Sequence, residues 1–326
     1  MMPSALLILA FTMGLVANRT TLCAVMAVDE MRSKRKAKIL ASFGKVILWA
    51  LAVSILLRWL GDFVPIHSAR YALNYHAILG GILLGIGAVC NGGCALHTLI
   101  RLGRGDLGML ISVLGMAASV WLITQTNIHI PDYLQASKIP DIDIAPTYLK
   151  AMKTLLTLWI VVELFRLFRG FKLTQWKQHL FANRYRLSSA AAILGICNGV
   201  LFTIIGTWTY TYTLITSITE LMTQHESPSL FSPLLLLSLS LTLLLGIAAS
   251  AIQKRNFLIA FRPSKSWIGY LVGGTLMGLG AQLIPGGNDV LLFNSIPELS
   301  PHAIPAYISM LLGIAISLQI KQRFLK

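Results

Sequence analysis

The sequence predicts an all-α integral membrane protein with about nine transmembrane helices, some of them interrupted, arranged as an inverted internal repeat. Three observations support this fold class: an apolar composition, nine long apolar stretches, and a glycine-rich pattern that occurs once in each half of the chain. Of the 326 residues, 56% are hydrophobic and 12% are charged, and the mean hydropathy is +0.72. Soluble domains carry about a quarter charged residues, so this composition indicates a chain that lies within a bilayer.

The nine apolar stretches are each long enough to cross a bilayer core of roughly 30 Å, which takes about 20 residues of helix. They lie near residues 5–28, 39–60, 72–99, 106–125, 148–168, 188–220, 231–252, 267–293 and 303–320. The third, sixth and eighth are too long for one straight helix and contain Gly, Pro or Asn residues, so we expect them to be interrupted or re-entrant. No basic segment precedes the first stretch, which we interpret as a membrane helix rather than a cleaved signal peptide.

The basic residues indicate the orientation of the spans. The formal net charge is +15, and 20 of the 27 Lys and Arg residues lie in the loops after the first, third, fifth and seventh spans or at the C-terminal end. Cytoplasmic loops carry an excess of Lys and Arg, so we expect a periplasmic N-terminus and a cytoplasmic C-terminus. This distribution predicts an odd number of spans and no nucleic-acid partner.

The glycine-rich pattern GG-x-L-x-G-x-GA begins at Gly80 and again at Gly273. It divides a single membrane domain, residues 1–326, into repeat halves at about 5–125 and 188–320, joined by a connecting span and basic loop at about 126–187. Four spans in each half and one between them would make the halves enter the membrane in opposite directions, as in many transporters. Each copy of the pattern continues into helix-breaking residues, at positions 90–94 and 285–289, where we expect a substrate site near the bilayer midplane.

The four cysteines, Cys23, Cys90, Cys94 and Cys197, all lie in apolar stretches. None forms a paired C-x2-C pattern, so we expect neither a metal site nor another cofactor. Neutral thiols are soft, weak hydrogen-bond donors that suit a soft, sulfur-bearing anion. A cysteine can also act as a small apolar packing residue. We favour packing for Cys197 and ligand contact for Cys23 and Cys94, and we leave Cys90 open.

Arg19 and Asp289 are charged residues in apolar stretches and are therefore functional candidates. Arg19 precedes Cys23 by four residues, which predicts that both lie on one face of a helix. Arg19 would either attract an anion or pair with Asp29 or Asp289. Asp289 would either carry a proton or cap a helix after the Pro-Gly turn.

A compact polar turn follows the third span at residues 101–106. We expect Asp106 to cap the fourth span and to bridge to Arg101 or Arg104. His97 lies one helical turn after Cys94 and is expected to pack. No Ser/His/Asp arrangement, P-loop or dinucleotide fingerprint is present, so the sequence predicts no enzyme.

Residues 85–94, Thr98 and residues 101–106 together resemble a motif of the YeeE/YedE family of sulfur-compound transporters, and the similarity extends through both halves. The resemblance implies an hourglass-shaped, multi-pass protein of the bacterial inner membrane that takes up thiosulfate, with cysteines contacting the ion in turn. Cys23 and Cys94 match two of those cysteines. The third is absent, and Gly287 and Asn288 stand in its place.

We therefore expect uptake of thiosulfate or a related small sulfur anion through a cysteine-lined constriction surrounded by membrane lipids. The candidate substrate-binding residues are Arg19, Cys23, Cys90, Asn91, Gly92, Gly93, Cys94, Gly286, Gly287, Asn288 and Asp289. No ATP site is present, which leaves passive transport, ion coupling or a partner, such as a cytoplasmic sulfurtransferase, as alternatives. Two other functions remain open. One is a membrane thiol protein that transfers persulfide sulfur or electrons through Cys90 and Cys94. The other is a structural subunit.

Overall fold

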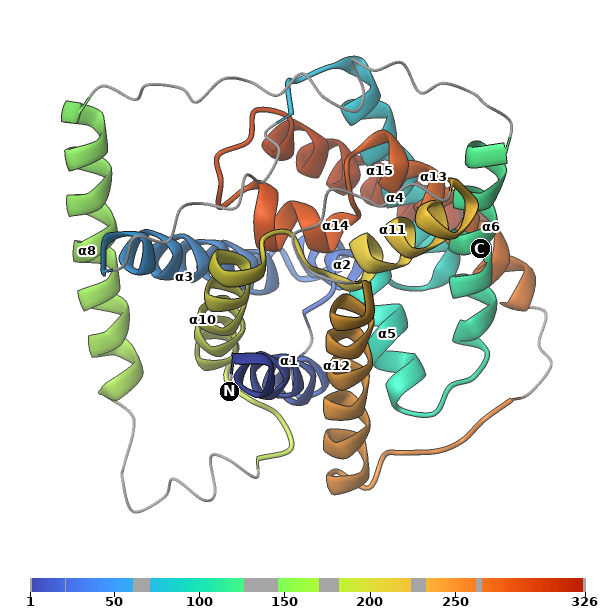
Figure 1. Ribbon diagram of the computed structural model, residues 1–326. Coiled ribbons are helices and arrows are strands. Elements are labelled where there is room, and N and C mark those ends of the chain that lie inside the picture. Colours follow the sequence, from blue (N-terminus) through green and yellow to red (C-terminus); the bar gives the residue numbers. More distant parts are fainter. Residues whose placement is uncertain are drawn as a thin grey trace.

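The computed structural model of the chain describes residues 2–20, 22–60, 71–125, 146–169, 182–223, 233–261 and 266–324 (Figure 1). The helices before residue 126 are α1 (Met2–Asn18), α2 (Ala24–Lys34), α3 (Lys38–Leu60), α4 (Tyr75–Asn91), α5 (Ala95–Gly103) and α6 (Met109–Gln125). The helices after residue 186 are α10 (Leu187–Ile205), α11 (Tyr210–Thr223), α12 (Pro233–Gln253), α13 (Ser266–Leu283), α14 (Asn288–Val290), the π-helical turn η2 (Leu291–Ser295) and α15 (Ala303–Phe324).

Helix α8 (Pro146–Phe168) lies between these two sets. Of the connecting region expected at 126–187, residues 126–145 and 170–181 lie outside the described residues. The described part contains helices and no strand, apart from an isolated bridge between Asp106 and Ala260, so the all-α prediction is confirmed there.

The three interruptions expected from the sequence are present. Helix α4 ends at Gly92, which has a φ of 77°, and α10 ends at Gly206, which has a φ of 85°. The break between α13 and α14 contains Gly286, with a φ of 106°. L side chains rarely adopt these values, so glycine allows the chain to leave the helix at these points.

A fourth interruption corrects the expectation of one continuous first span at 5–28. Helix α1 ends at Asn18 and α2 begins at Ala24. Asn18 and Thr20 lie at this interruption, and Asn and Thr side chains favour turns and helix caps over helix interiors. As a consequence, Arg19 and Cys23 do not share a helical face.

The described part of the chain does not confirm the expected nine spans. In the described part, five helices or joined helix pairs are long and apolar enough to cross a membrane, and six if α13 is counted with the bent segment 288–295. The apolar segments of α1 and α6, Ser4–Asn18 and Met109–Gln125, are shorter. The expected count of nine spans is therefore not confirmed.

The helices pack in reciprocal pairs. Helix α1 packs on α12 and α10 on α3, whereas α4 packs on α15 and α13 on α6. Helices α4 and α13, which carry the two glycine patterns, pack on each other. A Cβ added to Gly87 would lie 2.7 Å from the Gly273 carbonyl oxygen, and one added to Gly273 would lie 2.7 Å from that of Gly87. The repeated glycines thus let two backbones approach closely, as small residues do in membrane interfaces.

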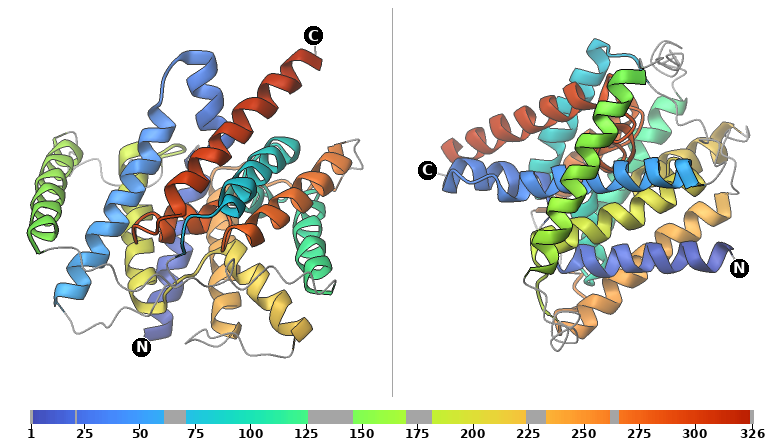
Figure 2. Two further views of the ribbon diagram at one scale, coloured as in Figure 1. Left: turned by 90° about the horizontal axis from the view of Figure 1, so that it is seen from above. Right: turned by 90° about the vertical axis from the view of Figure 1, so that its left-hand side faces the viewer.

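Helix α8 lies at the edge of the molecule in both Figure 1 and Figure 2. It is held to α3 by an edge-to-face contact between Trp49 and Trp159, with ring centroids 5.6 Å apart. An ion pair of 2.5 Å joins Lys45 Nζ to the buried carboxylate of Glu163. Figure 2 also shows that the start of α1 and the end of α15 lie on opposite sides of the molecule.

Candidate functional site

Two buried thiols lie near each other at the starts of α2 and α5, the helices that follow the two breaks in the first half of the chain. Cys23 is the residue before α2 and Cys94 is the residue before α5, and their side chains are 1% and 2% exposed. Each thiol lies close enough to the other to affect its ionisation, and neither is in a disulfide. Each thiol also faces a backbone group in the first turn of its own helix, at Met26 and His97 respectively. The thiol pair therefore lies at two helix N-termini, where unpaired N–H groups attract anions.

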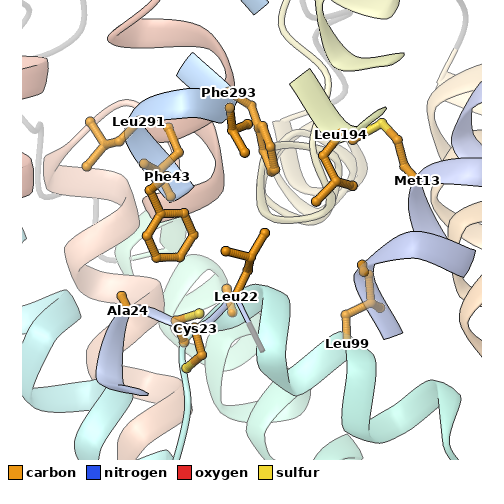
Figure 3. Close-up of a cluster of buried hydrophobic side chains, with 14 of the residues drawn as sticks. Met13, Leu22, Cys23, Ala24, Phe43, Leu99, Leu194, Leu291 and Phe293 are labelled. Carbon is orange, nitrogen blue, oxygen red and sulfur yellow. The ribbon is translucent and has the colours of Figure 1, made fainter. Parts of the chain in front are cut away.

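Apolar side chains surround this thiol pair. Figure 3 shows Cys23 below the ring of Phe43, with Leu291 and Phe293 farther above it. Leu99 of α5 belongs to the same buried cluster. Because few polar groups compete in such surroundings, electrostatic interactions between the thiol pair and an anion are stronger there than in water.

The first glycine break is held in shape by its own asparagine. The Asn91 amide donates to the Gly93 carbonyl oxygen at 3.0 Å and to Thr98 Oγ1 at 2.7 Å. A Cβ on Gly93 would lie 2.4 Å from the His97 ring. Asn91 and Gly93 therefore fix the course of the backbone that presents Cys94, and the Asn91 amide is directed at the break itself.

The second glycine break carries a buried carboxylate. Asp289, 4% exposed, accepts hydrogen bonds from the Thr211 backbone N–H at 3.1 Å and from the Thr211 hydroxyl. The Thr211 hydroxyl oxygen in turn accepts from the Gly287 N–H at 3.3 Å. Asp289 thus caps the N-terminus of α11 rather than that of its own helix, which stabilises the start of α11. Asn288 beside it is also 4% exposed.

A small cavity of about 30 Å³ lies next to this carboxylate. Its wall is mostly apolar, with Met13, Leu194 and Phe293 among the lining residues, and Asn198 and Asp289 supply polar atoms. This space is sufficient for about two water molecules.

Arg19 is 2% exposed, and it donates hydrogen bonds to side chains of α12 and to Tyr185. Its guanidinium donates to Ser250 Oγ at 3.1 Å, to the Tyr185 hydroxyl at 2.9 Å and to Gln253 Oε1. It also lies 5.1 Å from the centroid of the Tyr185 ring. Asp289, one of its two expected acidic partners, is bound to Thr211 instead.

The other two cysteines are not part of the thiol pair. Cys90 is exposed on α4, and Cys197 is buried on α10 among apolar residues, which fits the packing role expected for it. In the polar turn, Arg101 Nη2 donates to Asp106 Oδ2 at 2.6 Å, which confirms the expected bridge. The described residues contain no group of three or more His, Cys, Asp or Glu side chains that could hold a metal ion.

Tyr307 of α15 was not identified from the sequence. Its side chain is 8% exposed, and it is near enough to Cys23 and Cys94 to interact electrostatically with both. Its hydroxyl has no hydrogen-bond partner among the described residues. A single tyrosine in an apolar span gives no signal in the sequence, because only the fold brings α15 near the thiol pair.

A protein-family model described as "Sulphur transport" matches residues 19–316 of the chain. The matched region begins at Arg19 and includes all four helix breaks. No curated protein matches the chain at a significant level.

Proposed function

Since the chain belongs to the sulphur transport family, we propose that it carries thiosulfate, or a related small sulfur anion, into the cell through the constriction at Cys23 and Cys94. The family match makes the chain a sulfur-compound transporter. The choice of ion and the route through the thiols are the proposal.

One observation carries this route: a buried pair of thiols at the N-termini of α2 and α5. The N-terminus of a helix carries about half a positive charge, and two of them meet here. Neutral thiols can donate weakly to the terminal sulfur of thiosulfate. This combination attracts an anion without fixing a full positive charge beside it, so the ion can also leave.

The missing third cysteine is replaced by an amide in this proposal. Asn288 is buried and starts α14, after the Gly286–Gly287 turn that corresponds to the break before Cys94. An asparagine amide supplies two N–H donors, which is more than one thiol supplies. Asn288 would therefore bind the oxygen atoms of the anion while Cys23 and Cys94 bind its sulfur.

The reciprocal packing of α1 on α12 with α10 on α3 supports an inverted repeat, and so does the contact between the two glycine-rich helices. The opposite positions of the chain's two ends support an odd number of crossings. We therefore retain the proposed architecture: an hourglass in the bacterial inner membrane whose waist is formed by the four breaks, with the basic loops in the cytoplasm.

The proposal is tested by measuring the uptake of labelled thiosulfate into cells that lack other sulfur importers. We expect the wild type to import the ion, Cys94→Ala to lose at least about tenfold in rate at matched expression, and Cys197→Ala to keep the wild-type rate. A tenfold loss corresponds to about 1.4 kcal/mol. If the wild type imports nothing, thiosulfate is the wrong ion. If Cys94→Ala imports normally, the route through the thiols is wrong.

The proximity of Cys23 and Cys94 also favours a second candidate, a membrane protein that transfers sulfur or electrons through this pair. It predicts a Cys23–Cys94 disulfide or a persulfide during turnover, with little flux of thiosulfate across the bilayer. Mass measurement of the peptides that contain these cysteines separates the two functions.

A further inference from the structure

Three cationic side chains converge near Asn18, where α1 ends. Arg104 Nε donates to Asn18 Oδ1 at 2.6 Å and Arg104 Nη2 to the Asn18 carbonyl oxygen at 3.3 Å. Lys254 Nζ donates to the same carbonyl oxygen at 3.2 Å. Arg19 is the next residue in the chain, and it binds Ser250 on the helix that ends just before Lys254. The cluster of Arg19, Arg104 and Lys254 thus joins the ends of α1, α5 and α12.

The hydrogen bonds that the structure gives for these three side chains go to neutral acceptors. No described carboxylate lies within ion-pair distance of Arg104 or Lys254, although Arg101, three residues before Arg104, has an ion pair with Asp106. Arg104 and Lys254 are half-buried. Cations that are partly withdrawn from water often have an acidic partner, because an unpaired charge is costly there. Two positive side chains in such surroundings therefore favour a ligand of opposite charge.

The positive potential acts on the cations themselves. Burial and the neighbouring Arg101 lower the pKa of Arg104. Burial, followed by Arg104, Arg19 and Arg184, lowers the pKa of Lys254. The C-terminal ends of α1, α5 and α12 each contribute about half a negative charge, which only partly offsets the two full positive charges of Arg104 and Lys254. A net positive potential remains for an anion.

The cluster of Arg19, Arg104 and Lys254 lies near the thiol pair along two chain segments. Helix α5 has nine residues and connects Cys94, before its start, to Arg104, after its end, a length of about 14 Å. The break between α1 and α2 connects Asn18 to Cys23 in five residues. An ion that leaves the thiol pair along α5 reaches the cations within one short helix.

We propose that Arg19, Arg104 and Lys254 form a second binding site, for a small oxyanion, on the side of the thiol pair that the basic loops assign to the cytoplasm. The position of this site on the ion's route depends on the proposed function. Thiosulfate has a soft sulfur end and a hard end with three oxygens. The thiols suit the first end, and guanidinium and ammonium groups suit the second through charge-assisted hydrogen bonds.

The test uses the purified full chain in nanodiscs of zwitterionic phosphatidylcholine, with sulfate as the probe. Sulfate has oxygens but no terminal sulfur, so it measures the cationic site alone. At low ionic strength we expect Arg104→Gln and Lys254→Gln each to raise the Kd for sulfate about tenfold. Arg104→Lys should recover part of the affinity. The control Lys321→Gln, an exposed cation on α15, should leave it unchanged.

An unchanged Kd in both Gln variants, with wild-type thermal stability, overturns the site. An absence of sulfate binding by the wild type also overturns the site.

A phosphate headgroup offers the same chemistry as a free oxyanion, so the measurement is repeated with anionic phosphatidylglycerol in the disc. If this lipid raises the Kd for the wild type but not for Arg104→Gln, the site holds lipid, and its place on the ion's route is wrong. Sulfate binding does not depend on Cys94, so a failure of thiosulfate uptake is distinguishable from a failure of this site.

Discussion

The Tyr307 hydroxyl provides a test of ligand contact at the scale of one residue. It is buried near the thiol pair without a described hydrogen-bond partner. Removing a buried hydroxyl that has no partner costs no protein hydrogen bond, so we expect Tyr307→Phe to be as stable as the wild type or slightly more stable. If the hydroxyl donates to the anion, the same variant should lower uptake about five- to tenfold, equivalent to about 1 to 1.4 kcal/mol.

The measurement for Tyr307→Phe pairs thermal unfolding of the purified protein with thiosulfate uptake at several concentrations. Loss of a contact made by the bound ion would raise KM, whereas unfolding would lower the amount of active protein at every concentration. Unchanged uptake would show that the hydroxyl does not contact the ion.

At the scale of single residues, the sequence indicates which residues are candidates for the site but not how they are arranged. Cys23 and Cys94 lie near each other at the starts of α2 and α5, and their joint role in binding stays a prediction. The prediction that Arg19 shares a helical face with Cys23 is wrong, because the spacing rule applies only within a continuous helix. Tyr307 and Thr211 come from distant segments, and only tertiary packing brings them to the breaks.

Some glycines on the membrane helices lie where two helices pack closely, and others have open space around them. A Cβ on Gly87 would lie 2.7 to 2.9 Å from atoms of α13, two of them backbone atoms that cannot move independently. A Cβ on Gly44 in α3 would meet no atom within 4 Å. We expect Gly87→Ala to destabilise the protein by about 1 to 3 kcal/mol. Gly44→Ala should stabilise it by up to about 1 kcal/mol, because alanine favours the helix.

Thermal unfolding in detergent micelles checks both variants under the same conditions. Gly44→Ala is the matched control, since it makes the same chemical change in a helix without the packing conflict. Equal stability of the two variants would mean that α4 and α13 do not approach as closely as the structure has them.

Element boundaries could be predicted where the chain carries glycine or proline at the break. The patterns after Gly80 and Gly273 predicted the interruptions that the structure places at Gly92 and Gly286. The interruption after Asn18 has neither residue type and was read as continuous helix. A short polar run that includes Thr20 is a weaker signal, since threonine also occurs within membrane helices.

For the whole molecule, hydropathy predicted the class of protein but not the number of complete crossings. The apolar stretch expected as one span at 5–28 is divided between α1 and α2, and the apolar segments of α1 and α6 are shorter than the helices that could cross a bilayer. A hydropathy pattern alone does not reveal either feature. The glycine pattern predicts two related halves, and the structure adds the packing pairs α1 with α12 and α10 with α3.

The proposed orientation of the whole chain rests on its charge and on the positions of its ends. The start of α1 and the end of α15 lie on opposite sides of the molecule, and α15 ends with Lys321 and Arg323. Since basic residues are retained in the cytoplasm, we expect a reporter fused after residue 324 to be cytoplasmic and one fused before residue 2 to be periplasmic. Alkaline phosphatase, active only outside the cytoplasm, and a fluorescent protein that folds inside it give opposite readouts at each position.

Activity of the same reporter at both ends would require an even number of crossings. The two halves would then not enter the membrane in opposite senses, and the inverted repeat would be wrong.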